Sequence, residues 1–199
     1  MFNYSQDTRV VISFITIAIT LYGFVPFIRG IHRNEIKPHA FSWIVWAMTT
    51  LITFTVQLAA KGGAGAIPMG ISGSITSYIA VISYIKRTDL SIKKIDWLFL
   101  ILCLGSIPFW YLTSDPFGAV AILTLVDLLG FGPTIRKCYE EPFQESIHFY
   151  SVFTVRNLLT IPALEDKNPT TVLFPLAVGL ACLGLVLILI YRRRILTQK

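Results

Sequence analysis

The chain has 199 residues, of which 54% are apolar, and its mean hydropathy is +0.67. Soluble domains are less apolar and about a quarter charged, so an ordinary soluble fold is excluded and a membrane protein is expected. The net charge is +6, but the basic residues lie in short groups between apolar runs, which favours the anionic surface of a lipid bilayer as partner over a nucleic acid. The three cysteines have no paired spacing, which argues against disulfides or a metal site, and no cofactor is expected.

Seven apolar runs are long enough to cross a bilayer as helices, since a span needs roughly 20 residues. They cover residues 9–29, 40–60, 65–86, 95–113, 116–136, 146–164 and 170–191. The sixth run is the least apolar, because it carries His148, Arg156 and Asn157. The first run is interpreted as a mature helix and not as a removed signal peptide, because no net-positive segment precedes it and no small-residue cleavage site follows.

Lysine and arginine gather in the loops on one side of these seven helices, and basic loops stay in the cytoplasm. That side carries Arg29, Arg33, Lys37, Lys86, Arg87, Lys93, Lys94, Arg136, Lys137, Arg192, Arg193, Arg194 and Lys199, whereas the other side carries only Arg9, Lys61 and Lys167. The N-terminus is therefore predicted outside and the C-terminus in the cytoplasm. A bacterial inner membrane is the first expectation for the compartment, and a eukaryotic membrane stays open.

Two short segments, YGFVPFIRG at 22–30 and LGFGPTIRK at 129–137, match at a shift of 107 residues. The same shift, without a gap, pairs residues in all three helices of each half: Gly23 with Gly130, Phe24 with Phe131, Pro26 with Pro133, Ile28 with Ile135, Arg29 with Arg136, Thr53 with Thr160, Pro68 with Pro175 and Tyr84 with Tyr191. Chance similarity of apolar segments is the alternative, but shared Pro, Gly-Phe and Arg favour an internal repeat. Helices one to three then match helices five to seven, and helix four is a linker.

The expected fold is an all-α integral membrane protein with seven transmembrane helices, built as two parallel three-helix bundles joined by a linker helix. Residues 1–87 form the first bundle, residues 88–114 the linker helix, and residues 115–199 the second bundle with a basic C-terminal tail. Three helices alone would leave the second half inverted in the membrane. The linker helix returns the chain to the side where the first half began, so both halves have the same orientation. One class of transporters has this arrangement, with the solute site between the halves.

Two charged residues are expected near mid-depth in the membrane, Asp127 in the fifth helix and Arg156 in the sixth. A lone charge there costs roughly 2.5 to 3.5 kcal/mol, so the two are predicted to form a pair. The repeat matches them with Thr20 and Thr49, so the charges occur in one half only. Two interpretations stay open, a structural ion pair and a functional pair. In a functional pair, either Asp127 takes up a proton while Arg156 holds an anionic group, or the two residues together bind a zwitterion.

Each half places two aromatic side chains and one polar side chain on the same face of its second helix. Aromatic faces with a few amide or hydroxyl groups suit a sugar or a nucleoside-like solute. For Trp43, which is expected nearer the membrane surface, an aromatic stripe in the bundle core or in the interfacial belt is at least an equal alternative. The candidate substrate-binding residues are Trp43, Trp46, Thr50, Asp127, Tyr150, Arg156 and Asn157, with Ser74 from the third helix.

Pro26 and Pro133 each remove a backbone donor, so both should kink their helices. The prolines open two related segments, PFIRGIHRNEIKPHAFSWIVW and PTIRKCYEEPFQESIHFYSVF, in which basic residues follow near the cytoplasmic end. Over nearly its whole length the chain resembles the PQ-loop and SWEET superfamily of small-solute transporters, and the vitamin transporters of the PnuC type share the arrangement. The resemblance implies that Pro26 and Pro133 are hinges of a cytoplasmic gate. A static kink that improves packing is the alternative.

The expected function is transport of a small polar solute (a sugar, an amino acid or a vitamin-like molecule) by alternating access. A membrane receptor similar to the KDEL receptors, which binds a ligand without moving it, is the alternative. An enzyme is not expected, because the three histidines are scattered, and a retinal protein is excluded, because residues 170–191 contain no lysine. The identity of the substrate and assembly into a homo-oligomer stay open.

Overall fold

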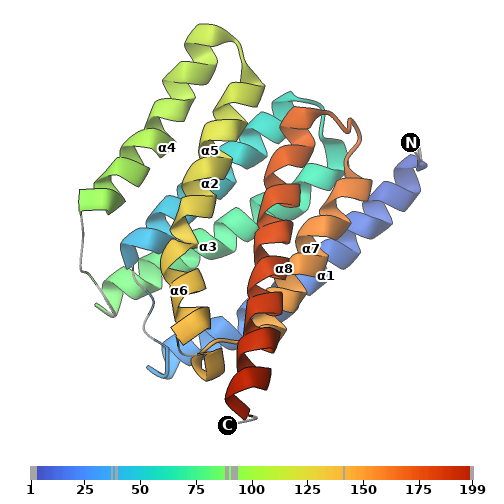
Figure 1. The fold of residues 1–199 in the computed structure, drawn as a ribbon. Helices are drawn as coiled ribbons and strands as arrows, with labels where there is room; N and C mark the ends of the chain where they lie inside the picture. Colours follow the sequence, from blue (N-terminus) through green and yellow to red (C-terminus); the bar gives the residue numbers. More distant parts are fainter. Residues whose placement is uncertain are drawn as a thin grey trace.

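The computed structural model describes residues 4–36, 38, 40–87, 90, 94–140 and 142–197, and this part of the chain is built from helices and their connections (Figure 1). The α-helices are α1 (Gln6–His32), α2 (Ala40–Ala59), α3 (Ile67–Ile85), α4 (Lys94–Thr113), α5 (Pro116–Gly130), α6 (Gly132–Glu140), α7 (Ile147–Ala163) and α8 (Pro169–Thr197). Two 3-10 helices, η1 (Gly63–Ala66) and η2 (Pro142–Gln144), precede α3 and α7. Lys37, Lys93 and Lys199, counted above for orientation, lie outside the described residues.

Four helical segments of the described chain are long and apolar enough to cross a membrane, namely Gln6–His32, Ala40–Ala59, Gly63–Ile85 and Pro169–Thr197. Two shorter apolar helices are Trp97–Thr113 and Pro116–Gly130. α7 has 17 residues and carries Arg156 near its centre. The length and composition of these helices support a membrane-embedded, all-helical protein.

Local sequence signals explain where several helices begin. Ser5 precedes α1 and its hydroxyl accepts a hydrogen bond from the Thr8 N–H, and Ser146 does the same for the Phe149 N–H of α7. Both side chains satisfy a backbone donor that has no partner in the first turn of a helix. A proline opens α5 and α8, where its missing N–H is not needed.

The expected single helix over residues 116–136 is wrong, because the chain forms two helices there. α5 ends at Gly130, the Phe131 N–H donates to the Leu128 and Leu129 carbonyls, and α6 starts at Gly132 with Pro133 as its second residue. Proline has no N–H to donate to the carbonyl four residues earlier, and its ring clashes with that turn. The helix therefore ends at Gly130, ahead of Pro133. Its repeat counterpart Pro26 lies instead inside the unbroken helix α1.

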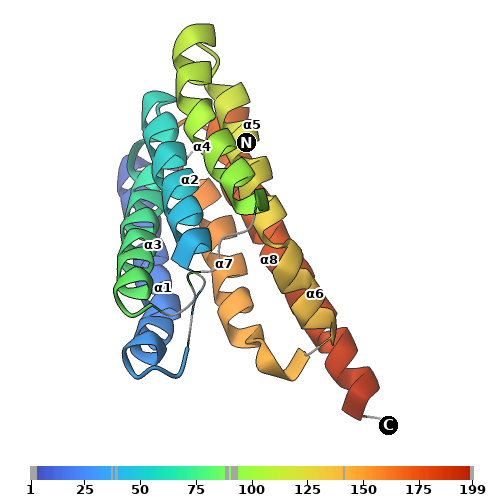
Figure 2. The same ribbon diagram turned by 90° about the vertical axis from the view of Figure 1, so that its left-hand side faces the viewer.

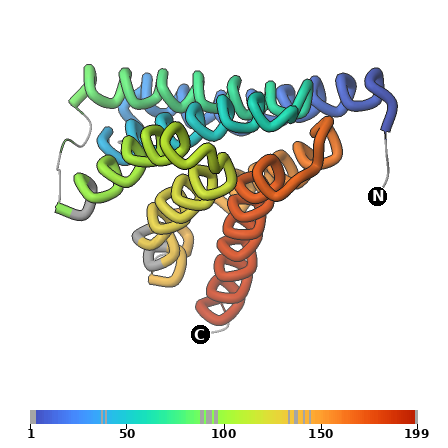
Figure 3. Tube along the Cα trace, turned by 90° about the horizontal axis from the view of Figure 1, so that it is seen from above, coloured from blue at the N-terminus to red at the C-terminus, as the bar shows by residue number. Residues whose placement is uncertain are grey.

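Two groups of three helices pack in the same order, and each group is called a triplet here: the first is α1, α2 and α3, and the second is α5, α7 and α8, with α6 following α5. In the first triplet α3 packs against both α1 and α2, and in the second triplet α8 packs against both α5 and α7. Across the boundary α1 packs against α7, and α2 packs against α5. Figures 2 and 3 show α1, α2 and α3 on one side of the molecule and α6 and α8 on the other. α4 packs against α5 and α2, at the outside of the bundle.

The two ends of the bundle differ in their connections (Figure 1). The N-terminus and the α2–α3, α4–α5 and α7–α8 connections lie at one end, called here the N-terminal end. The C-terminus and the α1–α2 and α6–α7 connections lie at the other, called the C-terminal end. Basic side chains at this end bind backbone carbonyls of neighbouring helices. Lys86, the residue that caps α3, donates from Nζ to the carbonyl of His32 at the end of α1 at 2.7 Å, and Arg192 of α8 donates from Nε to the Tyr139 carbonyl of α6 at 2.8 Å.

Candidate solute-binding site

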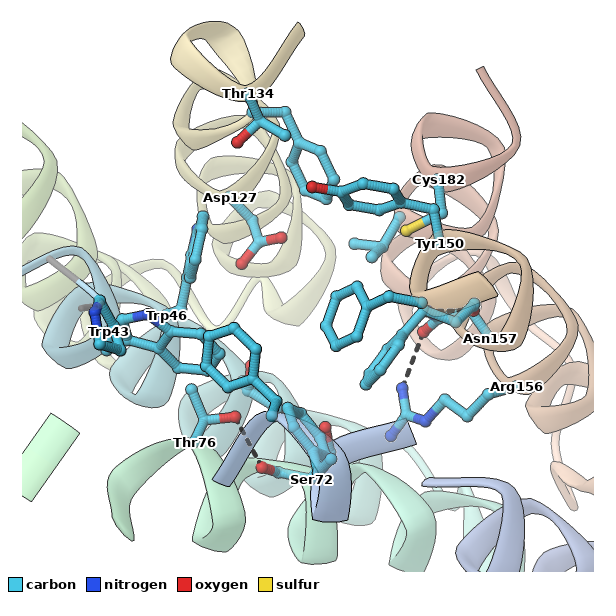
Figure 4. A pocket seen from close by; sticks show the side chains of 18 of the residues that line it. Trp43, Trp46, Ser72, Thr76, Asp127, Thr134, Tyr150, Arg156, Asn157 and Cys182 are labelled. Carbon is cyan, nitrogen blue, oxygen red and sulfur yellow. Dashed lines mark hydrogen bonds between the residues drawn. The ribbon is translucent and has the colours of Figure 1, made fainter. Parts of the chain in front are cut away.

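A cavity of about 600 Å³ lies between the two triplets (Figure 4). Its size is within the range of small-molecule sites, and its wall combines many aromatic rings with a few polar groups, as such sites do. The lining residues are Phe24, Phe27, Ile36, Pro38, Trp43, Trp46, Thr50, Met69, Ser72, Thr76, Asp127, Phe131, Thr134, Glu145, Phe149, Tyr150, Phe153, Arg156, Asn157, Phe174, Val178 and Cys182.

The aromatic rings of the wall pack against one another across the two triplets. Phe24 of α1 meets Phe153 of α7 edge to face, with ring centroids 4.8 Å apart. Trp46 of α2 meets Phe131, between α5 and α6, at 6.4 Å. Trp43 and Trp46 form a T-shaped pair on α2 at 5.5 Å. These contacts fix the positions of the rings that line the cavity.

Arg156 is buried in the wall, with 3% of its surface exposed, and its guanidinium is held by neutral acceptors. Nε donates to the Thr20 hydroxyl at 3.2 Å, one terminal nitrogen to the Asn157 side-chain oxygen at 2.8 Å, and the other to the Pro68 carbonyl at 2.8 Å. The three acceptors come from α1, α7 and α3. Arg156 therefore connects the two triplets without having its charge neutralised by them.

Asp127 is the second buried charge, with 6% of its surface exposed. The Thr49 hydroxyl lies 3.0 Å from its Oδ1 and also 3.0 Å from the Trp46 carbonyl. A hydroxyl has one proton to donate, so the carboxylate shares its donor with a backbone oxygen. Asp127 is thus less completely hydrogen-bonded than Arg156.

The predicted ion pair between Asp127 and Arg156 is wrong in the part of the chain that the structure describes. Each residue bonds instead to a threonine of the first triplet, and Figure 4 shows the two charges on different sides of the cavity. The reason is the order of the helices. α8 packs between α5, which carries Asp127, and α7, which carries Arg156, so two residues of the same triplet are kept apart.

The contacts across the cavity occur in pairs that the shift of 107 residues interchanges. The shift moves Thr49–Asp127 onto Arg156–Thr20, since 49 becomes 156 and 127 corresponds to 20. It also moves Phe24–Phe153 onto Phe131–Trp46. Gly23 lies against Phe153 in the same way as Gly130 lies against Trp46. The boundary between the triplets therefore contains the same set of contacts twice.

The candidate residues mostly come together at this cavity. Trp43, Trp46, Thr50, Tyr150 and Asn157 line it, together with the two charges. Ser74 does not, because its side chain is exposed on α3 and its hydroxyl donates to the Gly70 carbonyl of its own helix. Ser72 and Thr76 line the cavity in its place.

Several residues of the cavity wall and its supporting contacts were not predicted from the sequence. The phenylalanines of the wall and the threonines that hold the two charges were not among the candidates, although the repeat alignment already matched Thr20 with Asp127 and Thr49 with Arg156. The side chains of Cys103, Cys138 and Cys182 are buried. Among the described residues, no group of three or more His, Cys, Asp or Glu side chains is arranged to hold a metal ion.

The two ends of the bundle differ in the connections that lie near the cavity. Towards the C-terminal end its wall includes Ile36, Pro38 and Glu145 from the connecting segments. At the N-terminal end the α2–α3 and α7–α8 connections are bonded to each other: the Glu165 N–H donates to the Gly62 carbonyl at 3.0 Å and the Asp166 N–H to the Lys61 carbonyl at 3.1 Å.

A glycine lets these two connections approach closely. A Cβ atom at Gly65 would collide with the backbone of Ala163 and Leu164, so only glycine fits there. Gln57 of α2 adds a buried hydrogen bond from its Nε2 to the Thr171 carbonyl at 2.7 Å. Two triplets are thereby joined at the N-terminal end through contacts named here the N-terminal seal: Gln57, Lys61, Gly62, Gly65, Ala163, Leu164, Glu165, Asp166 and Thr171.

No family model matches this chain, and neither a curated protein nor a solved structure matches it. The function is therefore inferred from the cavity and from the side chains that line it.

Proposed function

We propose that the protein is a membrane transporter that moves a small polar solute across the bilayer by alternating access of its two triplets. The observation that carries the proposal is the cavity between the triplets, lined by aromatic rings and by the buried polar side chains of Asp127, Arg156 and Asn157. Buried ionisable groups in a membrane protein cost free energy and usually mark a substrate or ion path. A cavity of about 600 Å³ accommodates a solute of the size of a sugar, an amino acid or a vitamin.

The proposed architecture has seven spans, with α5 and α6 together forming the fifth and α7 the sixth. Residues 1–87 and 115–199 are two parallel repeats, and residues 88–114 supply the linker helix. Support comes from the contacts that the shift of 107 interchanges, because contacts of this kind arise when two similar halves face each other about an approximate twofold axis. The position of α4 on the outer surface of α2 and α5 agrees with a linker that does not line the path.

The proposed orientation puts the C-terminal end of the bundle in the cytoplasm. Lys86, Arg192 and Arg193 gather there and bind backbone carbonyls at that end, and basic residues favour the cytoplasmic side. The structure then corresponds to a state whose external end is closed by the N-terminal seal. Transport requires the seal to open while the cytoplasmic end closes, and the break between α5 and α6 supplies a bending point next to the cavity.

Flux measurements in liposomes test this proposal. The purified protein is first screened by thermal shift against sugars, amino acids, nucleosides and vitamins, because a ligand at 100 times its Kd stabilises by about 2.7 kcal/mol. Uptake of each labelled binder into proteoliposomes is then measured. We expect uptake that saturates with concentration and that is accelerated when unlabelled solute is present inside. Binding without uptake would contradict transport and identify a receptor.

A matched pair of variants connects the flux to the cavity. Thr50 lines the cavity and Thr55 lies on the exposed face of the same helix, α2. Thr50→Trp should obstruct the cavity and weaken both binding and uptake, whereas Thr55→Trp should leave both unchanged. Equal uptake by the two variants would show that the solute passes elsewhere.

A further inference from the structure

Two buried side chains of opposite charge line one cavity without meeting each other, and this arrangement restricts the solute. We propose that the cavity takes a zwitterionic organic solute, whose ammonium group binds at Asp127 and whose carboxylate group binds at Arg156. The inference rests on the proposed function of the cavity as a solute site, and it names the chemical class of that solute.

An ionised Asp127 favours a cationic partner on its side of the cavity. The residue is 6% exposed, and its carboxylate shares the single hydroxyl proton of Thr49 with the Trp46 carbonyl. A buried carboxylate with so few donors is costly unless a cation or several N–H groups approach it. An ammonium group supplies three donors and a full charge, and the rings of Trp46 and Phe131 in the same wall favour a cation over their faces.

The Arg156 side requires an anionic partner. Its guanidinium has five N–H donors, and the hydrogen bonds described above go to neutral oxygens, those of Thr20, Asn157 and Pro68. These bonds hold the planar group rigidly in one orientation at the wall, while its charge stays uncompensated. A carboxylate of a solute would neutralise that charge through charge-assisted hydrogen bonds.

Other classes of solute satisfy only part of this arrangement. A neutral sugar would displace water from both charges and neutralise neither, and an amine or a carboxylate alone would leave one charge buried and unpaired. Glu145 is the other carboxylate of the wall, but it lies at the C-terminal end, where its Oε2 accepts a hydrogen bond from the Tyr150 hydroxyl at 2.8 Å. A solute that carries both charges compensates Asp127 and Arg156 together.

A series of linear probes tests the class and measures the spacing of the two charges. The probes are ω-aminocarboxylates with two to eight carbons, with the n-alkylamine and the n-alkanoate of each length as single-charge controls. Binding to the purified wild-type protein is measured by calorimetry at neutral pH. We expect one chain length to bind best and to bind at least about 30-fold more tightly than either single-charge control of that length. Equal affinity for the three probe types, no binding by any aminocarboxylate, or preferential binding of neutral sugars would overturn the proposal.

Charge-removing variants assign each end of the probe. Asp127→Asn should weaken binding of the aminocarboxylate and of the alkylamine, but not of the alkanoate. Arg156→Gln should weaken binding of the aminocarboxylate and of the alkanoate, but not of the alkylamine. Exposed Asp115→Asn and Arg194→Gln are the matched controls and should bind as the wild type does. If a folded single variant no longer bound any of the three probe types, the assignment would be contradicted. If a variant fails to fold, the wild-type length series decides alone.

Uptake of the best aminocarboxylate separates this inference from the proposed function. Binding with the expected charge selectivity but without uptake into proteoliposomes would keep the zwitterion site and overturn transport. Uptake of another solute, with no selective binding of zwitterions, would keep transport and overturn the site assignment.

Discussion

Each buried charge is held by a threonine of the opposite triplet. Arg156 bonds to Thr20 and Asp127 bonds to Thr49, although both charges lie in the second triplet. The threonine hydroxyl is small and donates or accepts as required, so it fits opposite either charge. If Asp127 and Arg156 had formed an ion pair, each would have neutralised the other. Neither charge would then have been available to a solute. At the scale of residues, the cavity keeps its polarity because the charges bind to neutral partners.

A double-mutant cycle can distinguish these partners. Asp127→Asn and Arg156→Gln should be additive in the free energy of unfolding within about 0.5 kcal/mol, because residues without shared contacts do not couple. Thr20→Val with Arg156→Gln, and Thr49→Val with Asp127→Asn, should instead couple by about 0.5 to 3 kcal/mol. Unfolding is measured in mixed micelles with increasing denaturant. A strong coupling between the two charged residues would contradict the structure.

Two glycines control the approach of the triplets next to the cavity. A Cβ atom at Gly23 would lie 2.9 Å from the Phe153 ring, and one at Gly130 would lie 2.7 Å from Trp46 Nε1. Gly23→Ala and Gly130→Ala should each destabilise by about 1 to 3 kcal/mol and disturb binding, because the rings they displace line the cavity. Gly184→Ala on α8 is the control, since nothing lies within 4 Å of its added Cβ.

The glycine control should behave in the opposite direction. Alanine at position 184 should leave binding unchanged and stabilise α8 by up to about 1 kcal/mol, because alanine loses less backbone entropy in a helix. Thermal unfolding and ligand binding of the three variants give the comparison. Similar effects of all three would mean that helix propensity, and not the close approach of the rings, determines the result.

At the scale of elements, the first helices of the two triplets differ. α1 runs without interruption through Pro26, whereas the corresponding segment breaks into α5 and α6 at Phe131 before Pro133. Phe131 and Thr134, which flank the break, line the cavity, so a change of angle there would alter the solute site directly. Bending is therefore expected to be concentrated in the second triplet.

Proline replacement tests where the bending occurs. Pro133→Ala restores a backbone donor and should let α5 continue into α6, which would slow uptake while leaving binding largely intact. Pro26→Ala should have a smaller effect, because α1 is already continuous. Pro108→Ala is the control, since Pro108 is exposed inside α4, outside the cavity. Wild-type uptake rates in both Pro26→Ala and Pro133→Ala would show that these prolines serve packing only.

The positions of the helices could be predicted from the sequence, but their neighbours could not. Most apolar runs bounded by Pro, Ser and charged loops mark a helix within a few residues, since length and hydropathy are local properties, but the run 116–136 divides into α5 and α6. The order within a triplet depends on packing between distant residues. That order separates Asp127 from Arg156 by α8, and a prediction based on depth alone paired them wrongly.

The candidate site shows the same division between local and distant information. Trp43, Trp46, Thr50, Tyr150 and Asn157 were found because the aromatic and polar positions recur on one helix face in both halves. The prediction that Ser74 lines the site was wrong. α3 has polar residues at positions 72, 74, 76 and 77, so the sequence pattern does not indicate which face of the helix is inside. The face is decided by packing of Gly70 and Gly73 against Phe54 and Leu51 of α2.

At the scale of the whole molecule, the N-terminal seal joins connections that lie more than 100 residues apart in the chain. Its backbone hydrogen bonds link Gly62 with Glu165 and Lys61 with Asp166, and both residues of the second pair are exposed. If the triplets move relative to each other during transport, this seal has to open in every cycle. A covalent bond across it should therefore stop the cycle.

Disulfide cross-linking provides this test. Lys61→Cys and Asp166→Cys are combined in a chain whose three native cysteines are replaced by alanine. Oxidation should cross-link the pair, because the Asp166 N–H already donates to the Lys61 carbonyl at 3.1 Å, and it should abolish uptake, which a reducing agent then restores. Each single-cysteine variant, oxidised in the same way, is the control. Full uptake by the cross-linked protein would exclude opening at this end.

The interchange of contacts between the triplets has a consequence for how the two halves recognise each other. Two copies of the second triplet about a true twofold axis would form an isologous dimer, in which Asp127 of each copy faces Arg156 of the other. Two copies of the first would bring Thr20 opposite Thr49 instead. Ion pairing would thus favour self-association of separated second halves over the pairing seen in the intact chain. The linker helix α4 opposes this mispairing, since it keeps one copy of each half at high effective concentration beside the other.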